Sequence, residues 1–229
     1  MKTWGLLEYR LQWTLTLRGW LVIVSLAIVA FWLFAIRIQP FLACSKPLKA
    51  DALVVEGWLS DQALKAAMTE FERGHYKLLI TTGLPLPKGH FLSQYKNLAQ
   101  LSADTLIALG FDASQLAVVP APYVKKYRTA ASAVALRQWL ATSPVAIESV
   151  NLYSYDVHTR RSWLLFKQAL EPEIKVGAIA LSAEYETPWW TTSDGARAVI
   201  AETIAYFYST LRSEVTPFLN SDATQTKES

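Results

Sequence analysis

Cysteine and histidine are scarce in this sequence, which has one cysteine, Cys44, and three histidines among 229 residues. A single cysteine excludes an intramolecular disulfide and a zinc site built from cysteine ligands. The net charge is only +3 and no basic run exceeds two residues, so the sequence does not favour nucleic-acid binding. The GxGxxG motif, the P-loop and the GxSxG motif are also absent. Composition therefore indicates neither a metal site nor one of these phosphate-binding or catalytic loops.

What the sequence does contain is a long apolar run, residues 19–36, between Arg18 and Arg37. As a helix it would be about 27 Å long, close to the ~30 Å hydrocarbon core of a bilayer. Tryptophans lie in or near the run, as in the aromatic belts of membrane interfaces: Trp4, Trp13, Trp20 and Trp32. A cleaved signal peptide has a shorter apolar region and a small-residue cleavage site. We therefore expect an uncleaved membrane anchor.

The charges around this run do not decide its orientation. Three basic residues precede it and three follow it: Lys2, Arg10 and Arg18, then Arg37, Lys46 and Lys49. We divide the chain into five parts in order. They are a short N-terminal segment (1–18), a transmembrane helix (19–36), a linker (37–49), an α/β domain (50–213) and a polar, disordered tail (214–229).

Beyond the linker, short apolar segments alternate with amphipathic ones. The predicted strands are 52–55, 78–80, 116–119, 150–155 and 176–181. The predicted helices are 60–74, 91–109, 130–140, 158–170 and 193–211. This alternation predicts a Rossmann-like, three-layer α/β domain with a parallel sheet of about five strands. Such sheets bind ligands outside the carboxyl ends of their strands, so those ends are where we look for a site.

The segment SYDVHTRRSW, residues 154–163, follows the fourth predicted strand. His158 and Arg161 are three residues apart and would share the first turn of a helix. A helix start favours anions, and an arginine adds a two-pronged donor for phosphate or carboxylate. His158 could bind the same anion or transfer a proton. The alternative is structural, with Asp156 capping the helix and pairing with an arginine; Arg160 is expected to lie in solvent.

Other strand ends supply further candidates. Arg128 and Thr129 open a helix, where Thr129 could be the N-cap or contact a ligand. Glu56 ends the first strand and could be a base, although an ion pair with an arginine, Arg161 or Arg128, is favoured. Two glycines at strand ends would allow a ligand to approach the backbone closely: Gly57 and Gly83. Two tryptophans after the fifth strand would pack on the last helix, or line a pocket rim or membrane surface: Trp189 and Trp190.

These residues resemble the ElyC/SanA/YdcF family of bacterial envelope-associated proteins. The similar motifs are DALVVEGW at 51–58, TGL at 82–84, RT at 128–129 and HTRRS at 158–162. The resemblance covers about residues 50–213. Several positions depart from the family pattern. Trp58 and Leu84 replace its second glycines, Tyr123 replaces a glutamate, and Ala131 and Ser132 replace a Glu-Asn pair.

The resemblance implies a Rossmann-like domain anchored in the bacterial inner membrane, on its outer, periplasmic face. It also implies a role in peptidoglycan biogenesis or in the envelope barrier. One branch of the family is reported to bind S-adenosylmethionine, and no cofactor is indicated by the motifs themselves.

The function expected from these observations is the binding of a phosphate- or carboxylate-bearing ligand by a membrane-anchored envelope protein. The expected ligand contacts are Arg161, His158, Arg128, Thr129, Glu56, Gly57, Gly83 and Asp156. One alternative is an enzyme acting on a lipid-linked or nucleotide-linked cell-wall precursor, with His158 and Glu56 as acid and base. Another is a cytoplasm-facing binder of a nucleotide or S-adenosylmethionine.

Overall fold

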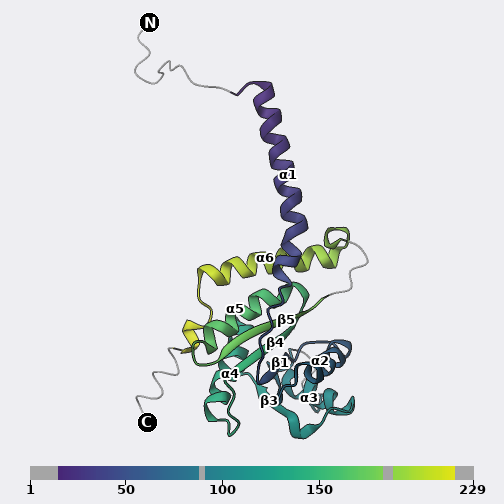
Figure 1. Ribbon diagram of the computed structural model, residues 1–229, viewed down its shortest axis with the longest axis vertical. Helices are drawn as coiled ribbons and strands as arrows, with labels where there is room; N and C mark the ends of the chain where they lie inside the picture. Colours follow the sequence, from purple (N-terminus) through teal and green to yellow (C-terminus); the bar gives the residue numbers. More distant parts are fainter. Residues whose placement is uncertain (1–14, 88–90, 183–187, 220–229) are drawn as a thin grey trace. The chain divides into compact units, whose positions relative to one another are not determined.

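The computed structural model describes residues 15–87, 91–182 and 188–219 (Figure 1). The chain forms two compact units, Met1–Arg37 and Ile38–Ser229. A single helix, α1 (Leu17–Leu42), begins in the first unit and ends in the second. By its length and composition this helix is long and apolar enough to cross a membrane.

The predicted linker, 37–49, is not a linker in the structure. Helix α1 continues to Leu42, because Ile38 and Leu42 bury their side chains in the second unit. The chain after it is held on the sheet by Asn151, whose amide accepts a hydrogen bond from the Leu48 N–H at 2.9 Å and donates one to the Leu48 carbonyl at 2.8 Å. An isolated antiparallel bridge joins Lys46 to Ala178. The sequence pattern could not show these contacts, since both partners lie far along the chain.

The second unit is built on a sheet of five parallel strands, as predicted (Figure 1). The strands are β1 (Ala52–Glu56), β2 (Leu78–Gly83), β3 (Leu116–Pro120), β4 (Ser149–Tyr155) and β5 (Lys175–Leu181). Their order in the sheet is β3-β2-β1-β4-β5. Every residue of β1 and β2 is buried, which explains why these strands read as continuous apolar runs rather than as alternating ones.

Helices cover both faces of the sheet. They are α2 (Asp61–Gly74), α3 (Leu98–Ala108), α4 (Arg128–Thr142), α5 (Thr159–Leu170) and α6 (Ser193–Leu211), with short 3-10 turns at Ala113–Gln115, Asp156–His158 and Trp189–Thr191. Leu53 and Val55 of β1 pack with α2 and α3, whereas Ala52 and Val54 pack with α4 and α5. Each face therefore has its own core. The three-layer architecture follows from this alternation of inward directions along each strand.

Helix α3 is shorter than the predicted range 91–109. The Asn97 side chain accepts a hydrogen bond from the Gln100 N–H at 2.8 Å and so caps the helix just before Leu98. Before the cap, the chain makes an isolated antiparallel bridge between Pro85 and Asn97. The Leu98 N–H also donates to the Leu84 carbonyl. The backbone of this segment is thus paired with the loop after β2 instead of with itself.

The predicted tail, 214–229, begins too early. Val215 is only 1% exposed and lies in the core that contains α4 and α5, and Phe218 and Leu219 pack against the same core. The start of the tail was predicted too early because the sequence around these three apolar side chains is mostly polar. Residues 220–229 lie outside the described part of the chain.

The strand order creates a switch point between β1 and β4. From β1 the chain moves outward to β2 and β3, and then returns across the sheet to β4 and β5. At such a point the loops after the two central strands diverge and leave a crevice at the carboxyl edge of the sheet. Glu56, the last residue of β1, lies at this edge.

Candidate functional site

A cavity of about 1050 Å³ lies at this carboxyl edge. Its walls come from the ends of β1 and β2, the loop before α4, and one side each of α4, α5 and α6. Six of the eight predicted ligand contacts line it: Glu56, Gly83, Arg128, Thr129, His158 and Arg161. Gly57 and Asp156 are not among the lining residues. The topology therefore brings together residues from four segments that are far apart in the sequence.

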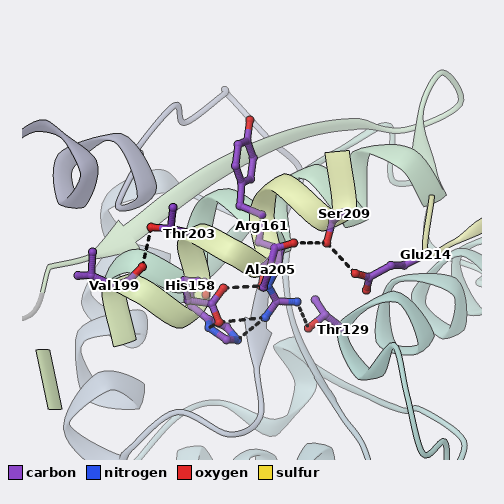
Figure 2. Close-up of polar contacts among 12 residues, drawn as sticks. Thr129, His158, Arg161, Val199, Thr203, Ala205, Ser209 and Glu214 are labelled. Carbon is purple, nitrogen blue, oxygen red and sulfur yellow. Dashed lines mark hydrogen bonds and ion pairs between the residues drawn. The ribbon is translucent and has the colours of Figure 1, made fainter. Parts of the chain in front are cut away.

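Arg161, the predicted anion receptor, is held by a carboxylate of the protein itself (Figure 2). Its Nε donates to Glu202 Oε2 at 2.8 Å, and Nη2 donates to Glu202 Oε1 at 3.2 Å. Nη1 donates to Thr129 Oγ1 at 3.4 Å. Glu202 comes from α6, which packs on α5, so the guanidinium of Arg161 faces a partner within the protein.

His158 completes this cluster. Its Nδ1 lies 2.6 Å from Glu202 Oε1, and its Nε2 lies 3.0 Å from Arg161 Nη2 (Figure 2). Because Arg161 can only donate, the network assigns Nε2 as the acceptor and Nδ1–H as the donor to Glu202. The ring also packs edge-on against Trp58, with 5.0 Å between ring centroids. Both ring nitrogens are therefore engaged inside the protein.

Interactions within the cluster favour the ionised forms of both Glu202 and Arg161. Burial alone would raise the pKa of Glu202, but hydrogen bonds from His158 and Arg161 outweigh it and lower that pKa to about 2. Burial would likewise lower the pKa of Arg161, and Glu202 outweighs it, so the pKa of Arg161 is raised. The two groups remain ionised at neutral pH and largely cancel one another's charge toward the cavity.

In the described part of the chain Glu56 forms no ion pair with an arginine, contrary to the favoured prediction. It is 4% exposed, and its carboxylate accepts hydrogen bonds from two serines, Ser154 and Ser162, the second at 3.1 Å. The carboxylate that pairs with Arg161 is that of Glu202 instead. The sequence could not reveal this, since Glu202 lies 41 residues beyond Arg161.

Two other predictions about helix starts are also corrected. Helix α4 begins at Arg128, so Thr129 is inside the helix rather than at its N-cap; Tyr127 precedes it in a left-handed conformation with a φ of 59°. Arg160 does not simply lie in solvent. Its Nε donates to the Phe41 carbonyl, and its guanidinium lies 3.9 Å from the centre of the Phe41 ring.

The two glycines serve packing. A Cβ at Gly57 would lie 2.7 Å from the carbonyl oxygens of Leu98 and Thr82. A Cβ at Gly83 would lie 2.8 Å from the Ala99 nitrogen. The start of α3 therefore comes too close to the sheet edge for any side chain. Gly83 also lines the cavity, whereas Gly57 does not.

Asp156 begins the 3-10 turn that precedes α5. It is 2% exposed and has a φ of 42°, a left-handed conformation that few residues adopt. This turn redirects the chain from β4 so that His158 and Arg161 reach the cavity. Asp156 thus contributes to one wall of the site through the backbone turn it begins, without lining the cavity itself.

Sequence reasoning missed three features of the cavity. Glu202 is one. The second is Thr82, which lines the cavity, is 1% exposed, and has a hydroxyl with no hydrogen-bond partner among the described residues. The third is a pair of exposed lysines on the loop before α4, Lys125 and Lys126; together with the predicted Arg128 at the start of α4 they are here called the rim cations. The adjacent lysines Lys125 and Lys126, just before a predicted helix, are the sequence feature that could have indicated this group.

The rim cations differ from Arg161 in their charge partners. Within residues 15–87, 91–182 and 188–219, no carboxylate forms an ion pair with Lys125, Lys126 or Arg128. The same described residues contain no group of three or more His, Cys, Asp or Glu side chains that could hold a metal ion. The cavity therefore offers positive charge at its mouth and a neutralised cluster inside.

Comparison with known proteins adds no relative. No protein-family model matches the sequence, and no curated protein matches it. The residues of the cavity are therefore the basis on which a function can be proposed.

Proposed function

We propose that the protein is a membrane-anchored binding protein whose cavity receives a phosphate- or carboxylate-bearing ligand. The observation that carries this proposal is the set of three rim cations, which form no ion pair in the described part of the chain, at the mouth of a roughly 1050 Å³ cavity. A cleft edged by charge of one sign concentrates ligands of the opposite sign. The volume is close to the upper end of the range of small-molecule sites in proteins, about 300–1,000 Å³.

The charges of the lining support an anion at the mouth. Three carboxylates line the cavity, and each accepts hydrogen bonds from the protein: Glu56, Glu202 and Glu214. They are buried, whereas the rim cations are exposed. The ligand's anionic group is therefore expected at the rim cations, and Arg161 becomes a residue that holds the wall in place. The unpartnered Thr82 hydroxyl would meet a polar group deeper in the cavity.

Binding without catalysis is favoured over an enzyme. The candidate acid and base, His158 and Glu56, both have their polar atoms engaged by neighbouring side chains. A general acid or base must be within hydrogen-bond reach of its substrate, and both ring nitrogens of His158 are already used by Glu202 and Arg161. The enzyme alternative, acting on a lipid-linked or nucleotide-linked cell-wall precursor, would require this cluster to open first.

The setting of the proposal comes from the family resemblance and the apolar helix. We place the protein in the bacterial inner membrane as a single-pass protein with the α/β unit on the periplasmic face. Its role would be in peptidoglycan biogenesis or in maintenance of the envelope barrier. The alternative of a cytoplasm-facing nucleotide or S-adenosylmethionine binder differs in the side of the membrane and in ligand.

A thermal-shift panel tests the binding proposal. The full-length protein in detergent would be melted with nucleotides, S-adenosylmethionine, cell-wall nucleotide-sugars and short-chain polyprenyl phosphates. A ligand at about 100 times its dissociation constant stabilises a protein by roughly 2.7 kcal/mol, which a melting curve detects. We expect one anionic class to raise the melting temperature, and the double variant Lys125→Ala/Lys126→Ala to need a higher concentration for the same rise.

The matched control is Lys65→Ala, which removes an exposed lysine from α2, outside the cavity lining. This variant should respond to the ligand like the wild type. The same rise in the rim double variant as in the wild type would contradict the assignment of the anion to the rim. A panel in which no compound shifts the melting temperature would contradict the binding proposal.

A further inference from the structure

Helix α6 exposes large apolar side chains along one side. Four of them form what we call the outer stripe: Ile200, Ile204, Phe207 and Leu211. Their spacing of four, three and four residues puts them on one face of the helix. Ile204 is 66% exposed and Leu211 is 88% exposed. The stripe extends along about 17 Å of helix, at 1.5 Å per residue.

The buried side of α6 is the more polar one. It carries Glu202 and Ser209, which make hydrogen bonds within the protein. Between Arg197 and Arg212, Glu202 is the one charged residue, and it is buried. This distribution is the reverse of that of a helix lying on a soluble protein, which turns its apolar side inward. A continuous exposed apolar face marks a surface that another apolar phase covers.

The buried side of α6 also contacts the residues that directly follow the apolar run of α1. Val199 packs with Ile38 and Leu42, and the Tyr206 ring meets the Phe41 ring at 5.5 Å. Ile38 is covalently linked to Arg37, the charged residue that ends the run. The five residues from Ile38 to Leu42 cannot lie more than roughly 17 Å from the end of the run, because an extended chain covers about 3.4 Å per residue. If the run spans a bilayer, the part of α6 that contains Val199 and Tyr206 is therefore held close to it by chain connection alone.

We propose that the outer stripe of α6 docks on the surface of the bilayer that α1 enters, as an interfacial helix. Three aromatic side chains in or next to α1 and α6 are also exposed: Phe41, Trp190 and Tyr208. Aromatic rings are favoured at the boundary between headgroups and acyl chains. Arg212 follows the stripe and is exposed, where it can meet lipid phosphates.

Two segments of the chain itself are poor candidates for covering the stripe. Residues 220–229 are polar, with a single apolar residue, Ala223. Residues 1–14 precede the run and would be on the opposite side of a membrane that the run crosses. The inner side of α6 contributes Glu202, Ala205 and Tyr208 to the cavity. Docking would therefore bring the cavity within about one helix diameter, roughly 10 Å, of the lipid.

Spin labels on the full-length protein test this inference. The protein carries Cys44→Ala, which removes its one cysteine, and either Ile204→Cys or Phe207→Cys for the label. It is reconstituted in vesicles of phosphatidylcholine and phosphatidylglycerol, and accessibility to oxygen and to a water-soluble nickel complex is measured. Lys65→Cys on α2 is the control position, since Lys65 is exposed.

We expect the ratio of oxygen to nickel accessibility to be severalfold higher at positions 204 and 207 than at position 65. Ratios equal to that of the control would overturn the inference, because the stripe would then face water. Labels shielded from both reagents and broadened by coupling to a second label would also overturn it, because a second copy of the chain would cover the stripe. The outcome does not depend on whether the cavity binds an anion.

Discussion

At the scale of single residues, Glu202 decides what Arg161 can do. An arginine at a helix start is a ready receptor for an anion, but here the carboxylate of Glu202 takes both prongs of the guanidinium. The side chains are 13% and 11% exposed, so the pair is largely removed from water. Removing one partner of such a pair leaves a buried charge without compensation, which costs much more than the pair contributes net.

The first prediction at this scale concerns Glu202→Gln. The substitution keeps the shape but removes the charge opposite Arg161 and His158, so we expect the free energy of unfolding at neutral pH to fall by about 3 kcal/mol. The pKa of Glu202 in the folded protein, about 2, is below its ordinary value of 4.5, so the stabilisation is fully present above pH 4.5. It is lost as the pH falls from there toward 2.

Denaturation with urea at a series of pH values measures this effect. The difference in stability between wild type and Glu202→Gln should shrink as the pH falls below 4.5. Asp51, whose pKa is also lowered to about 2 chiefly by a hydrogen bond from Lys77, is present in both proteins and cancels in the comparison. A difference that stays constant across the acid range would show that the carboxylate charge does not stabilise the fold.

At the scale of elements, the distance between α3 and the sheet edge is set by two glycines. Gly57 follows β1 and donates its N–H to the Thr82 carbonyl at 2.6 Å, so the loop after β1 is held against β2. Helix α3 then begins with Leu98 against both loops. The cavity floor depends on this close approach, because Glu56, Thr82 and Gly83 line it from the same two strand ends.

The prediction at this scale concerns Gly57→Ala. The new methyl group would lie 2.7 Å from two backbone oxygens, which cannot move away as a side-chain tip could. We expect the free energy of unfolding to fall by about 1–3 kcal/mol, the usual cost of forcing extra volume into a packed site. Ala141→Ser, which adds one atom at an exposed position of α4, is the control and should change stability little. An unchanged stability in Gly57→Ala would mean that α3 can shift away from the sheet.

At the scale of the whole molecule, the proposal of a membrane anchor raises the question of which side of the membrane the α/β unit occupies. The charges on the two sides of the apolar run are balanced and give no answer. The envelope proposal needs the outer face, whereas the nucleotide or S-adenosylmethionine alternative needs the cytoplasm. The interfacial docking of α6 is compatible with either side.

A pair of reporters fused after Ser229 tests this point. Alkaline phosphatase is active outside the cytoplasm, and a fluorescent protein that folds in the cytoplasm reports the opposite orientation. We expect phosphatase activity and no fluorescence. The reverse result would contradict the envelope proposal and favour the cytoplasmic alternative; a fusion at Arg18, on the other side of the run, is the control and should give the opposite signal.

The sequence by itself determined the local elements, because their signals lie within a few residues of one another. The continuous apolar runs of β1 and β2 predicted buried parallel strands, and the range predicted for α6, 193–211, agrees with the observed helix. The alternation of strands and helices was enough to predict the sheet and the edge at which the cavity lies. His158 and Arg161 were also found in this way, since both follow a strand.

Only the tertiary structure decided the partners of these residues. Glu202 meets Arg161 because α6 packs on α5, and no local pattern records a contact across 41 residues. The same is true of Glu56 and Ser162, which are 106 residues apart, and of the residues before β1 that Asn151 holds. Helix periodicity showed that α6 is a helix, but only the tertiary structure determines which face of α6 is turned toward the protein interior. The fold buries the side with Glu202 and leaves the apolar stripe outside.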